Sequence, residues 1–184
     1  SAIPSVRVNN DTALKFTAVF AAIRLRSENL ASLPKRVSIE TSSGMIVDTK
    51  HPASIVIREK PNGYMNTFTF WEYLNACLDG WGNAFAIIES DGRGYPVALH
   101  PVHPRDVNVI YKNREKFFKV SKTGFSGMYE DAEMCHFFTL SNDGITGINP
   151  ITYNADAISL GISATKFGKE FFETGGNIKA VMES

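Results

Sequence analysis

Hydrophobic side chains recur at helical spacing near the start of the chain. Between residues 12 and 33 they fall at steps of three and four, the spacing of one helix face. The positions on this face are Phe16, Val19, Phe20, Ile23, Ser27 and Leu30. Asp11 is a residue type that caps helices, and Pro34 disfavours helical backbone just before it. The pattern predicts one helix that begins after Asp11 and ends at Leu33.

The spacing changes twice after this helix. Apolar residues alternate with polar ones around a Ser-Ser-Gly turn, which predicts a β-hairpin over residues 37–47. A short apolar segment at 55–57 ends at a Pro-Asn-Gly turn. Helical spacing returns over residues 67–81, with Thr67 or Thr69 as the cap and a glycine as the stop.

A period of two dominates the middle of the chain. Apolar and polar residues alternate in five short stretches separated by turn residues, as expected of antiparallel strands. These stretches are residues 84–89, 97–100, 107–111, 117–120 and 134–138.

A second long helical pattern follows a glycine-containing loop and spans residues 151–174. Its candidate buried face consists of Tyr153, Ala157, Leu160, Ala164, Phe167 and Phe171. A Gly-Gly stop and a strand at residues 178–182 come next, and we expect the natural protein to continue past Ser184. Strands grouped between helices predict an α+β fold: a helix, a β-hairpin, a second helix, antiparallel strands and a long C-terminal helix.

Length and composition are those of one folded domain. The 184 residues are 43% hydrophobic and 21% charged, which excludes disorder or a coiled coil as a whole-chain description. No apolar stretch approaches the roughly 18 residues of a membrane span, and residues 1–4 do not begin a signal peptide. Two cysteines without a disulfide framework favour a reducing compartment. We therefore expect 1–184 to be a single domain, the N-terminal part of a longer chain.

Charge is balanced overall but uneven along the chain. Nine basic and five acidic residues in 1–60 leave +4, and ten basic and fourteen acidic residues in 61–184 leave −4. This is not the basic footprint of a domain that grips nucleic acid tightly. One local basic run consists of Lys112, Arg114, Lys116, Lys119 and Lys122, with Phe117 and Phe118 between them. We consider an interface or phosphate contact there, although a solvated hairpin with one core-facing phenylalanine is the simpler interpretation.

Histidine and cysteine offer the main candidate chemistry. His100 and His103, with Cys135 and His136, have the residue types of a four-ligand zinc site. A structural role is favoured, because zinc sites usually show paired spacings in both halves. Cys77 lies on the apolar face of its helix, and strand alternation separates Cys135 from His136, so neither cysteine is predicted to be a nucleophile. With no nucleophile elbow or phosphate-binding loop in the sequence, we predict no enzyme activity, no catalytic or metal-binding residue and no cofactor.

A series of short motifs, each weak alone, occurs in order along nearly the whole chain. They are DTAL (11–14), AVFAAIR (18–24), LASLP (30–34), HP (51–52), PN (61–62), FWE (70–72), GNAFA (82–86), GYP (94–96), LHP (99–101), HF (136–137), GINP (147–150) and FFETG (171–175). Together they resemble the portal proteins of tailed phages of the Hong Kong 97-like type. Asn149, where serine is commoner, and Gly161 within the last helix depart from the family pattern.

The resemblance implies a structural role in a virion. Portal proteins of this family form a dodecameric ring at one capsid vertex, the head–tail connector through which DNA is packaged and ejected. The expected partners are other portal subunits, the terminase motor, capsid and head-completion proteins, and double-stranded DNA in the channel, with no membrane. The chain would be mostly wing region, with stem, clip and crown later in the sequence. The expected location is the portal vertex of the virion, with the host cytoplasm during assembly; the source is a phage or prophage.

Two alternatives stay open on the residues alone. One is a free-standing protein-binding module that acts through the long C-terminal helix. The other, less favoured, is a small metal-dependent hydrolase that uses the four histidine and cysteine ligands. Stoichiometric zinc in the purified chain would favour the hydrolase, and a reading frame that ends near Ser184 would favour the module.

Overall fold

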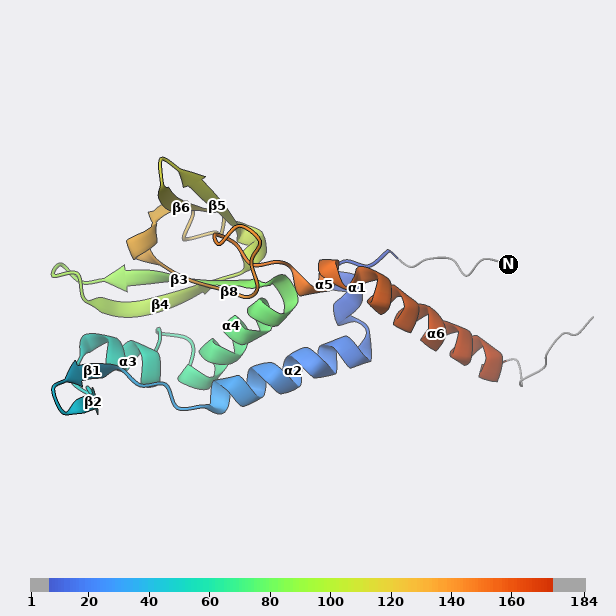
Figure 1. Cartoon of the computed structure of the whole chain (residues 1–184), viewed down its shortest axis with the longest axis horizontal. Helices are drawn as coiled ribbons and strands as arrows, with labels where there is room; N and C mark the ends of the chain where they lie inside the picture. Colours follow the sequence, from blue (N-terminus) through green and yellow to red (C-terminus); the bar gives the residue numbers. More distant parts are fainter. Residues whose placement is uncertain (1–6, 174–184) are drawn as a thin grey trace, which may run out of the picture. The chain divides into compact units, whose positions relative to one another are not determined.

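The structure is a computed structural model that describes residues 7–173 (Figure 1). The chain divides into two compact units, Ser1–Phe20 with Ile151–Ser184, and Ala21–Pro150. The predicted strand at 178–182 and the Gly-Gly stop before it lie outside the described residues. Within residues 7–173, the helices are too short or too polar to cross a bilayer.

The first unit begins with a short helix, α1 (Asn10–Leu14). Its cap is Asn9, whose side chain accepts a hydrogen bond from the Thr12 N–H at 2.9 Å, while the Asn9 N–H donates to the Thr12 hydroxyl at 2.8 Å. This reciprocal pair satisfies two N–H groups at the helix start. The predicted cap at Asp11 is wrong, because Asp11 already lies in the first turn, where its negative charge faces the positive end of the helix dipole.

The predicted single N-terminal helix is two helices. The backbone bends at residues 15–16 before α2 (Thr17–Ser32) begins. Ser27 and Ala31 are the buried residues of α2, whereas Phe20 is 52% exposed. The predicted apolar face is therefore correct in part: Ser27 is buried and Val19 and Ile23 are half-buried, whereas Phe20 and Leu30 are exposed.

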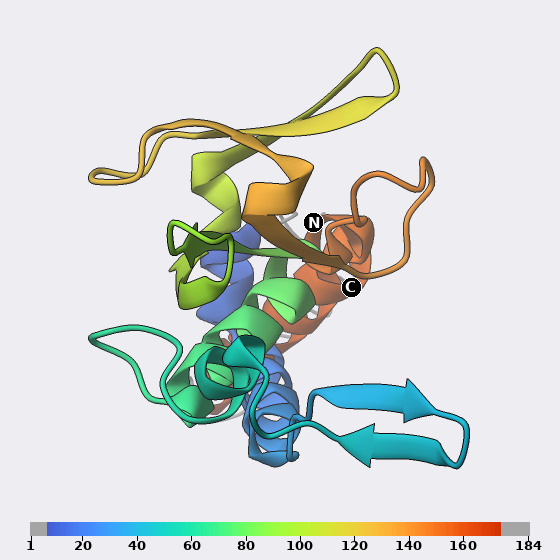
Figure 2. The ribbon, with the colours of Figure 1, turned by 90° about the vertical axis from the view of Figure 1, so that its left-hand side faces the viewer.

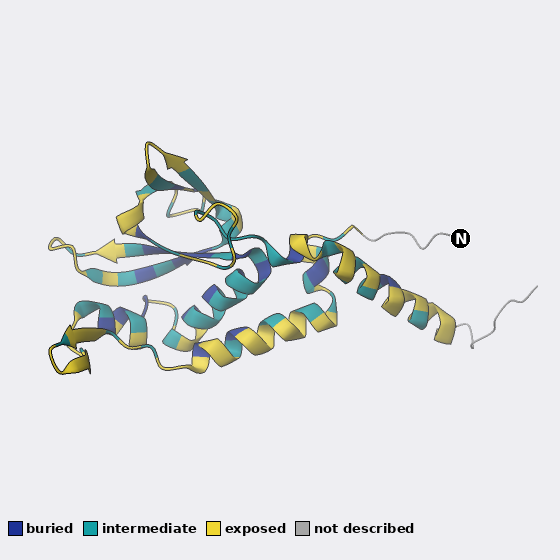
Figure 3. Ribbon diagram, in the orientation of Figure 1, coloured by how far each residue is buried: buried dark blue, intermediate teal, exposed yellow. Residues whose placement is uncertain are grey.

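The long C-terminal helix is also interrupted. It consists of α5 (Pro150–Tyr153) and α6 (Ala155–Glu173). Within the first unit, Gly161 lies against the ring of Phe16, which a Cβ at Gly161 would meet at 3.3 Å, and Ser163 is buried. The predicted buried face is wrong, since its large members are exposed: Tyr153 (77%), Leu160 (70%) and Phe167 (64%) (Figure 3).

The second unit is built on an antiparallel sheet of three strands in the order β4-β3-β8. The strands are β3 (Asn83–Ser90), β4 (Pro96–Val102) and β8 (Met134–Phe138). Side chains of the central strand β3 alternate between two cores. Ala84 and Ala86 belong to the core under the helices, and Phe85 and Ile87 to the core against a second sheet. All three strands confirm the sequence pattern.

The second sheet has the order β5-β6-β7 and is antiparallel throughout. Its strands are β5 (Val107–Lys112), β6 (Glu115–Val120) and β7 (Gly127–Glu130). Phe118 of β6 is fully buried and meets Phe85 edge to face, with ring centroids 5.9 Å apart. Short 3₁₀ turns, Pro104–Asp106 and Asp131–Glu133, precede β5 and β8. β7 was not predicted, because its four residues are too few to show a period.

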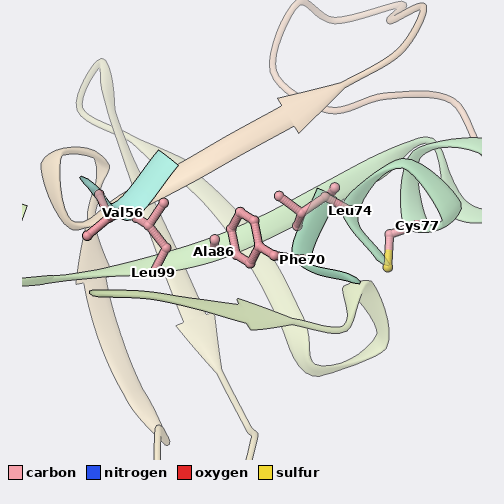
Figure 4. Close-up of a cluster of buried hydrophobic side chains, with 7 residues drawn as sticks. Val56, Phe70, Leu74, Cys77, Ala86 and Leu99 are labelled. Atoms are coloured by element: carbon pink, nitrogen blue, oxygen red, sulfur yellow. The ribbon is translucent and has the colours of Figure 1, made fainter. Parts of the chain in front are cut away.

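Two helices cover the other face of the β4-β3-β8 sheet. α3 (Pro52–Arg58) packs mainly on β4, and α4 (Thr67–Trp81) packs mainly on β3. Their core, shown in Figure 4, comprises Val56, Phe70, Leu74, Cys77, Ala84, Ala86 and Leu99. The cap of α4 is Asn66, not the predicted threonines, because the Asn66 side chain accepts from Thr69 N–H at 2.8 Å. Gly82 ends α4 with φ +75°, as its position predicted.

A separate two-stranded hairpin connects α2 to α3. β1 (Ser38–Thr41) and β2 (Gly44–Val47) pair only with each other among the described strands, and the hairpin extends away from the helices of its unit (Figure 2). This hairpin was predicted. Helices with grouped antiparallel strands confirm the predicted α+β class.

Candidate functional site

The basic run forms the β5–β6 hairpin. Asn113 and Arg114 occupy its turn with φ of 55° and 67°, and Lys112 is paired in register with Glu115. Two consecutive residues with positive φ are typical of the tight turn that matches the twist of a hairpin. The turn therefore holds Arg114 at the exposed tip of the sheet.

Strand alternation separates the five predicted basic residues into different environments. Lys119 and Lys112 lie on the outer face of the sheet, and both are exposed. Lys116 lies on the opposite face, where its Nζ is 2.9 Å from Asp131 Oδ1 and 5.4 Å from the centroid of the Phe118 ring. Lys122 donates to the Pro101 carbonyl oxygen at 2.9 Å. The five residues therefore do not form one patch.

Three of the five remain available for contact. Within residues 7–173, no ion pair is recorded for Lys112, Arg114 or Lys119. Phe117 shares the outer face with Lys119 and is half-buried, while Phe118 is in the core. One phenylalanine thus faces outward, as alternation predicted.

A hollow of about 610 Å³ lies beside the hairpin tip. Arg114 and Lys116 contribute positive charge to its wall. Three carboxylates also line it: Glu115, Glu130 and Asp131. Because acidic groups outnumber basic ones, this wall suits a partner protein of mixed charge better than a phosphate chain.

The four candidate metal ligands have separate structural roles. His103 caps a 3₁₀ turn by accepting from Arg105 N–H at 3.1 Å, and its ring meets Trp81 edge to face. His100 Nε2 lies 2.7 Å from Glu89 Oε2. In the described part of the chain, His, Cys, Asp and Glu side chains form no group of three that could hold a metal ion.

Both cysteines are shielded thiols. Cys77 is buried in the core of α4, as predicted, and burial raises the pKa of its thiol to about 12. Burial also raises the pKa of Cys135. In β8, Cys135 is paired with Ala86 and His136 with Phe85, so the two side chains point to opposite faces of the sheet. Neither thiol has the lowered pKa that a nucleophile needs.

Two of the sequence motifs meet at a tight junction in the second unit. Asn83, from GNAFA, donates to the Gly147 carbonyl at 2.9 Å and accepts from the Gly147 N–H at 2.9 Å. A Cβ on Gly147 would lie 2.0 Å from the Gly82 carbonyl oxygen, and a Cβ on Gly82 would lie 2.0 Å from the Ile148 oxygen. The junction therefore requires both glycines and fixes the loop that leads to α5. Both motifs are visible in the sequence, but the sequence does not predict that they are in contact.

His136 completes this junction. Its Nε2 lies 3.0 Å from Asn83 Oδ1, and its ring stacks on Phe85 at 4.5 Å. Because the Asn83 amide nitrogen donates elsewhere, Oδ1 is the acceptor, and His136 Nε2 carries the proton. Desolvation, with a smaller effect of nearby Lys116, lowers the pKa of His136 to about 4.

A second pair of motifs meets in the same way. Asn62 of the PN motif is 3% exposed, and its amide donates to the Leu99 carbonyl of LHP at 2.8 Å. The Leu99 N–H donates to the Pro61 carbonyl at 2.6 Å. Four of the motifs that carry the resemblance therefore form hydrogen-bonded joints between elements, which is a structural role.

Comparison with known proteins agrees with this pattern. The sequence profile of the family described as phage portal protein matches residues 17–184. The chain belongs to the phage portal protein family. A curated relative within the family is the portal protein of Enterobacteria phage HK97, 21% identical over 179 residues that cover 96% of this chain and 42% of that protein. The chain thus spans less than half the length of this relative.

Solved structures share the fold. An HK97-family phage portal protein from Corynebacterium diphtheriae matches with a TM-score of 0.66 and 16% identity, covering 98% of this chain and 54% of that one. A chain in the neck of a native gene transfer agent particle, computed with C12 symmetry, matches with a TM-score of 0.67 and 18% identity over 100% of this chain and 49% of that one. At these identities the likeness concerns the fold.

Proposed function

We propose that this chain is the structural subunit of a portal ring, the head–tail connector through which double-stranded DNA enters and leaves the capsid. The observation that carries the proposal is the family match over residues 17–184. The hydrogen-bonded joints formed by its motifs support a structural role rather than a catalytic one. The twelve-fold neck assembly that contains a chain of the same fold supports a ring.

The full protein then has the partners of a portal. Identical subunits complete the ring, and the terminase motor, the capsid and head-completion proteins bind to it. Residues 1–184 belong to the wing region, and stem, clip and crown belong to other parts of the chain. The protein acts in the virion at the portal vertex, assembles in the host cytoplasm and is not an enzyme.

The outer face of the β5–β6–β7 sheet is a subunit interface in this proposal. Lys112, Arg114 and Lys119 are its positive groups, and the uneven charge of the chain supplies negative groups on a neighbour. A ring made by rotation joins two different faces of each subunit, so opposite charges on those faces help neighbours to pair.

Deletion of the gene in the phage or prophage that encodes the chain tests this function. We expect heads without DNA, restored to DNA-filled heads by the wild-type gene supplied in trans. An antibody to the chain should mark one vertex per particle. Normal numbers of DNA-filled, tailed particles after deletion would contradict the proposal.

A further inference from the structure

Among the helices that the structure describes, only α3 and α4 cover the helix-facing side of the three-stranded β4-β3-β8 sheet. α3 packs on β4 and α4 on β3, while β8 lies at the edge of the sheet with little helix over it. Phe137 and Cys135 of β8 point to the helix side, because they are paired with Ala84 and Ala86 of β3. Phe137 is 38% exposed, so this side of β8 is incompletely covered.

An apolar cavity of about 330 Å³ lies at this place. Its wall includes Val56, Ile57, Phe70, Trp71, Cys135 and Phe137. Among residues 7–173, no charged side chain lines it, and its volume equals that of about ten water molecules. A cavity with such a wall favours aliphatic side chains over a charged or polar ligand.

The β1–β2 hairpin, by contrast, exposes apolar side chains that no described element covers. Ile39 and Ile46 are directly paired across the two strands, so they share one face, and they are 51% and 55% exposed. Thr41 and Gly44 complete that face toward the turn without charge, and the carboxylate of Asp48, whose N–H donates to the Val37 carbonyl at 2.8 Å, lies at its base. An isolated two-stranded hairpin is marginal in water and needs an apolar partner surface to become stable. We call Ile39, Thr41, Gly44 and Ile46 the isoleucine face.

We propose that the isoleucine face of one chain docks on the β8 side of a second copy and fills its apolar cavity. The inference rests on the proposed ring function. A ring joins unlike faces of identical subunits, so each subunit must carry both a projecting element and a receiving one. The hairpin projects from its unit (Figure 2), and neither the four residues of the isoleucine face nor the described wall of the cavity carries a charge, so docking them buries no unpaired charge.

The occupant is a second copy rather than the chain's own hairpin on two grounds. Among the described strands, β1 and β2 pair only with each other, and their large apolar residues are exposed (Figure 3). Its own tether runs directly from β2 into α3, whose residues form one wall of the cavity. A second copy brings the isoleucine face to the open side, beside β8, without moving that tether.

Natural Cys135 in the cavity wall gives a direct test. In the full-length natural protein, Ile46→Cys should form a disulfide with Cys135 of a neighbour when oxidised with copper phenanthroline, because the docked isoleucine face lies against the wall that contains Cys135. Such a disulfide requires Cα atoms within about 4.4–6.8 Å of each other. We expect a ladder of cross-linked subunits on a denaturing gel. Adding Cys135→Ser should abolish it, and buried Cys77 should not substitute.

Met45→Cys is the matched control, because Met45 is 71% exposed on the opposite face of the same hairpin. We expect at least about tenfold less cross-linked product from it, since a disulfide tolerates little displacement. Equal products from both positions would overturn the inference, and so would an internal disulfide that shifts mobility without a ladder, because the occupant would then be the chain's own hairpin.

Ring assembly is measured on the same samples by electron microscopy, which separates the two proposals. Rings that form without any cross-link would overturn docking and leave the portal function intact. Absence of rings together with absence of cross-links would overturn both. As a second variant, Ile46→Asp should raise the concentration needed for assembly about tenfold or more, and Met45→Asp should change it far less.

Discussion

At the scale of single residues, polar side chains hold this chain in shape by joining segments far apart in sequence. Asn83 reaches Gly147 and His136, and Asn62 reaches Leu99. Each amide satisfies backbone groups that would otherwise be left without partners. These joints give the asparagines of the PN and GNAFA motifs a structural role in this chain.

Asn83→Ala should destabilise the second unit by about 2 kcal/mol. The substitution removes both hydrogen bonds to Gly147 and leaves His136 Nε2–H without its acceptor. Urea unfolding followed by circular dichroism measures the change. Asn108→Ala, at an exposed strand position, is the matched control and should stay within about 0.5 kcal/mol. Equal stability of the two variants would contradict the role of the junction.

Acidification should weaken the same junction. His136 has a pKa of about 4 in the folded chain, against an ordinary value of 6.5, so the unfolded chain binds its proton first as pH falls. The contribution of neutral His136 to the free energy of unfolding is complete above pH 6.5 and declines as the pH falls toward 4. Because His136 is partly exposed to solvent, we expect the free energy of unfolding to fall by only about 1–2 kcal/mol. Lys116 and Asp131 are the other charged groups that act on His136, in opposite directions.

His136→Gln should remove this part of the pH dependence. Unfolding midpoints of the variant should be flat between pH 6.5 and pH 4, apart from what carboxylates contribute. Asp143, whose pKa lies well below its usual range because it accepts hydrogen bonds from Thr146 and Ile145, acts only at lower pH. An unchanged slope in the variant would contradict the assignment.

At the scale of elements, helix ends and close approaches depend on glycine. Gly82 ends α4 with positive φ and also meets the Ile148 backbone, whereas Gly94 has φ +82° with open space around it. A comparison of the two glycines therefore separates the effect of backbone conformation from the effect of packing. Both would be strained by a side chain, but only Gly82 lacks room for one.

Gly94→Ala should cost about 1–2 kcal/mol, the penalty of left-handed backbone. Gly82→Ala should cost about 3 kcal/mol or more, because its Cβ would lie 2.0 Å from the Ile148 oxygen and the loop must move. Thermal unfolding of the two variants side by side measures the difference. Equal losses would mean that the loop before α5 is not held at Gly82.

Elements were predicted well from the sequence, whereas their partners were not. The hairpin, α4 and five of the strands followed from periodicity and turn residues. The buried face of α6 did not, because periodicity shows where apolar residues gather but not whether another element covers them; small Gly161 makes the close contact instead. The buried face of α2 was predicted in part, since Ser27 is buried but Phe20 is exposed. Caps were missed by one to three positions, because Asn9 and Asn66 compete with nearby residues of similar capping ability.

The candidate site was predicted only in part for a related reason. The basic run lies in a hairpin as expected, but alternation turns Lys116 inward to Asp131, and Lys122 reaches the Pro101 carbonyl. Those two partners lie 15 and 21 residues away in sequence, and no local pattern identifies them. The asparagine joints were missed because they span 37 and 64 residues.

At the scale of the whole molecule, surface charge should control how subunits meet. Lys119→Glu reverses an exposed charge on the outer face of the second sheet, where we place a subunit interface. The concentration at which the full-length protein assembles should rise several-fold, and most at low salt, because screening is weakest there. Light scattering against concentration measures it. Lys60→Glu, exposed beyond α3, is the control, and identical assembly of the two variants would remove this face from the interface.

The central claim is that the chain builds a ring. Electron microscopy of the full-length natural protein in negative stain, with light scattering for its mass, tests this most directly. We predict rings with a central channel, about twelve-fold symmetry and a mass of about twelve subunits. A uniform population of monomers at high protein concentration, with no ring in the presence of capsid protein, would contradict it.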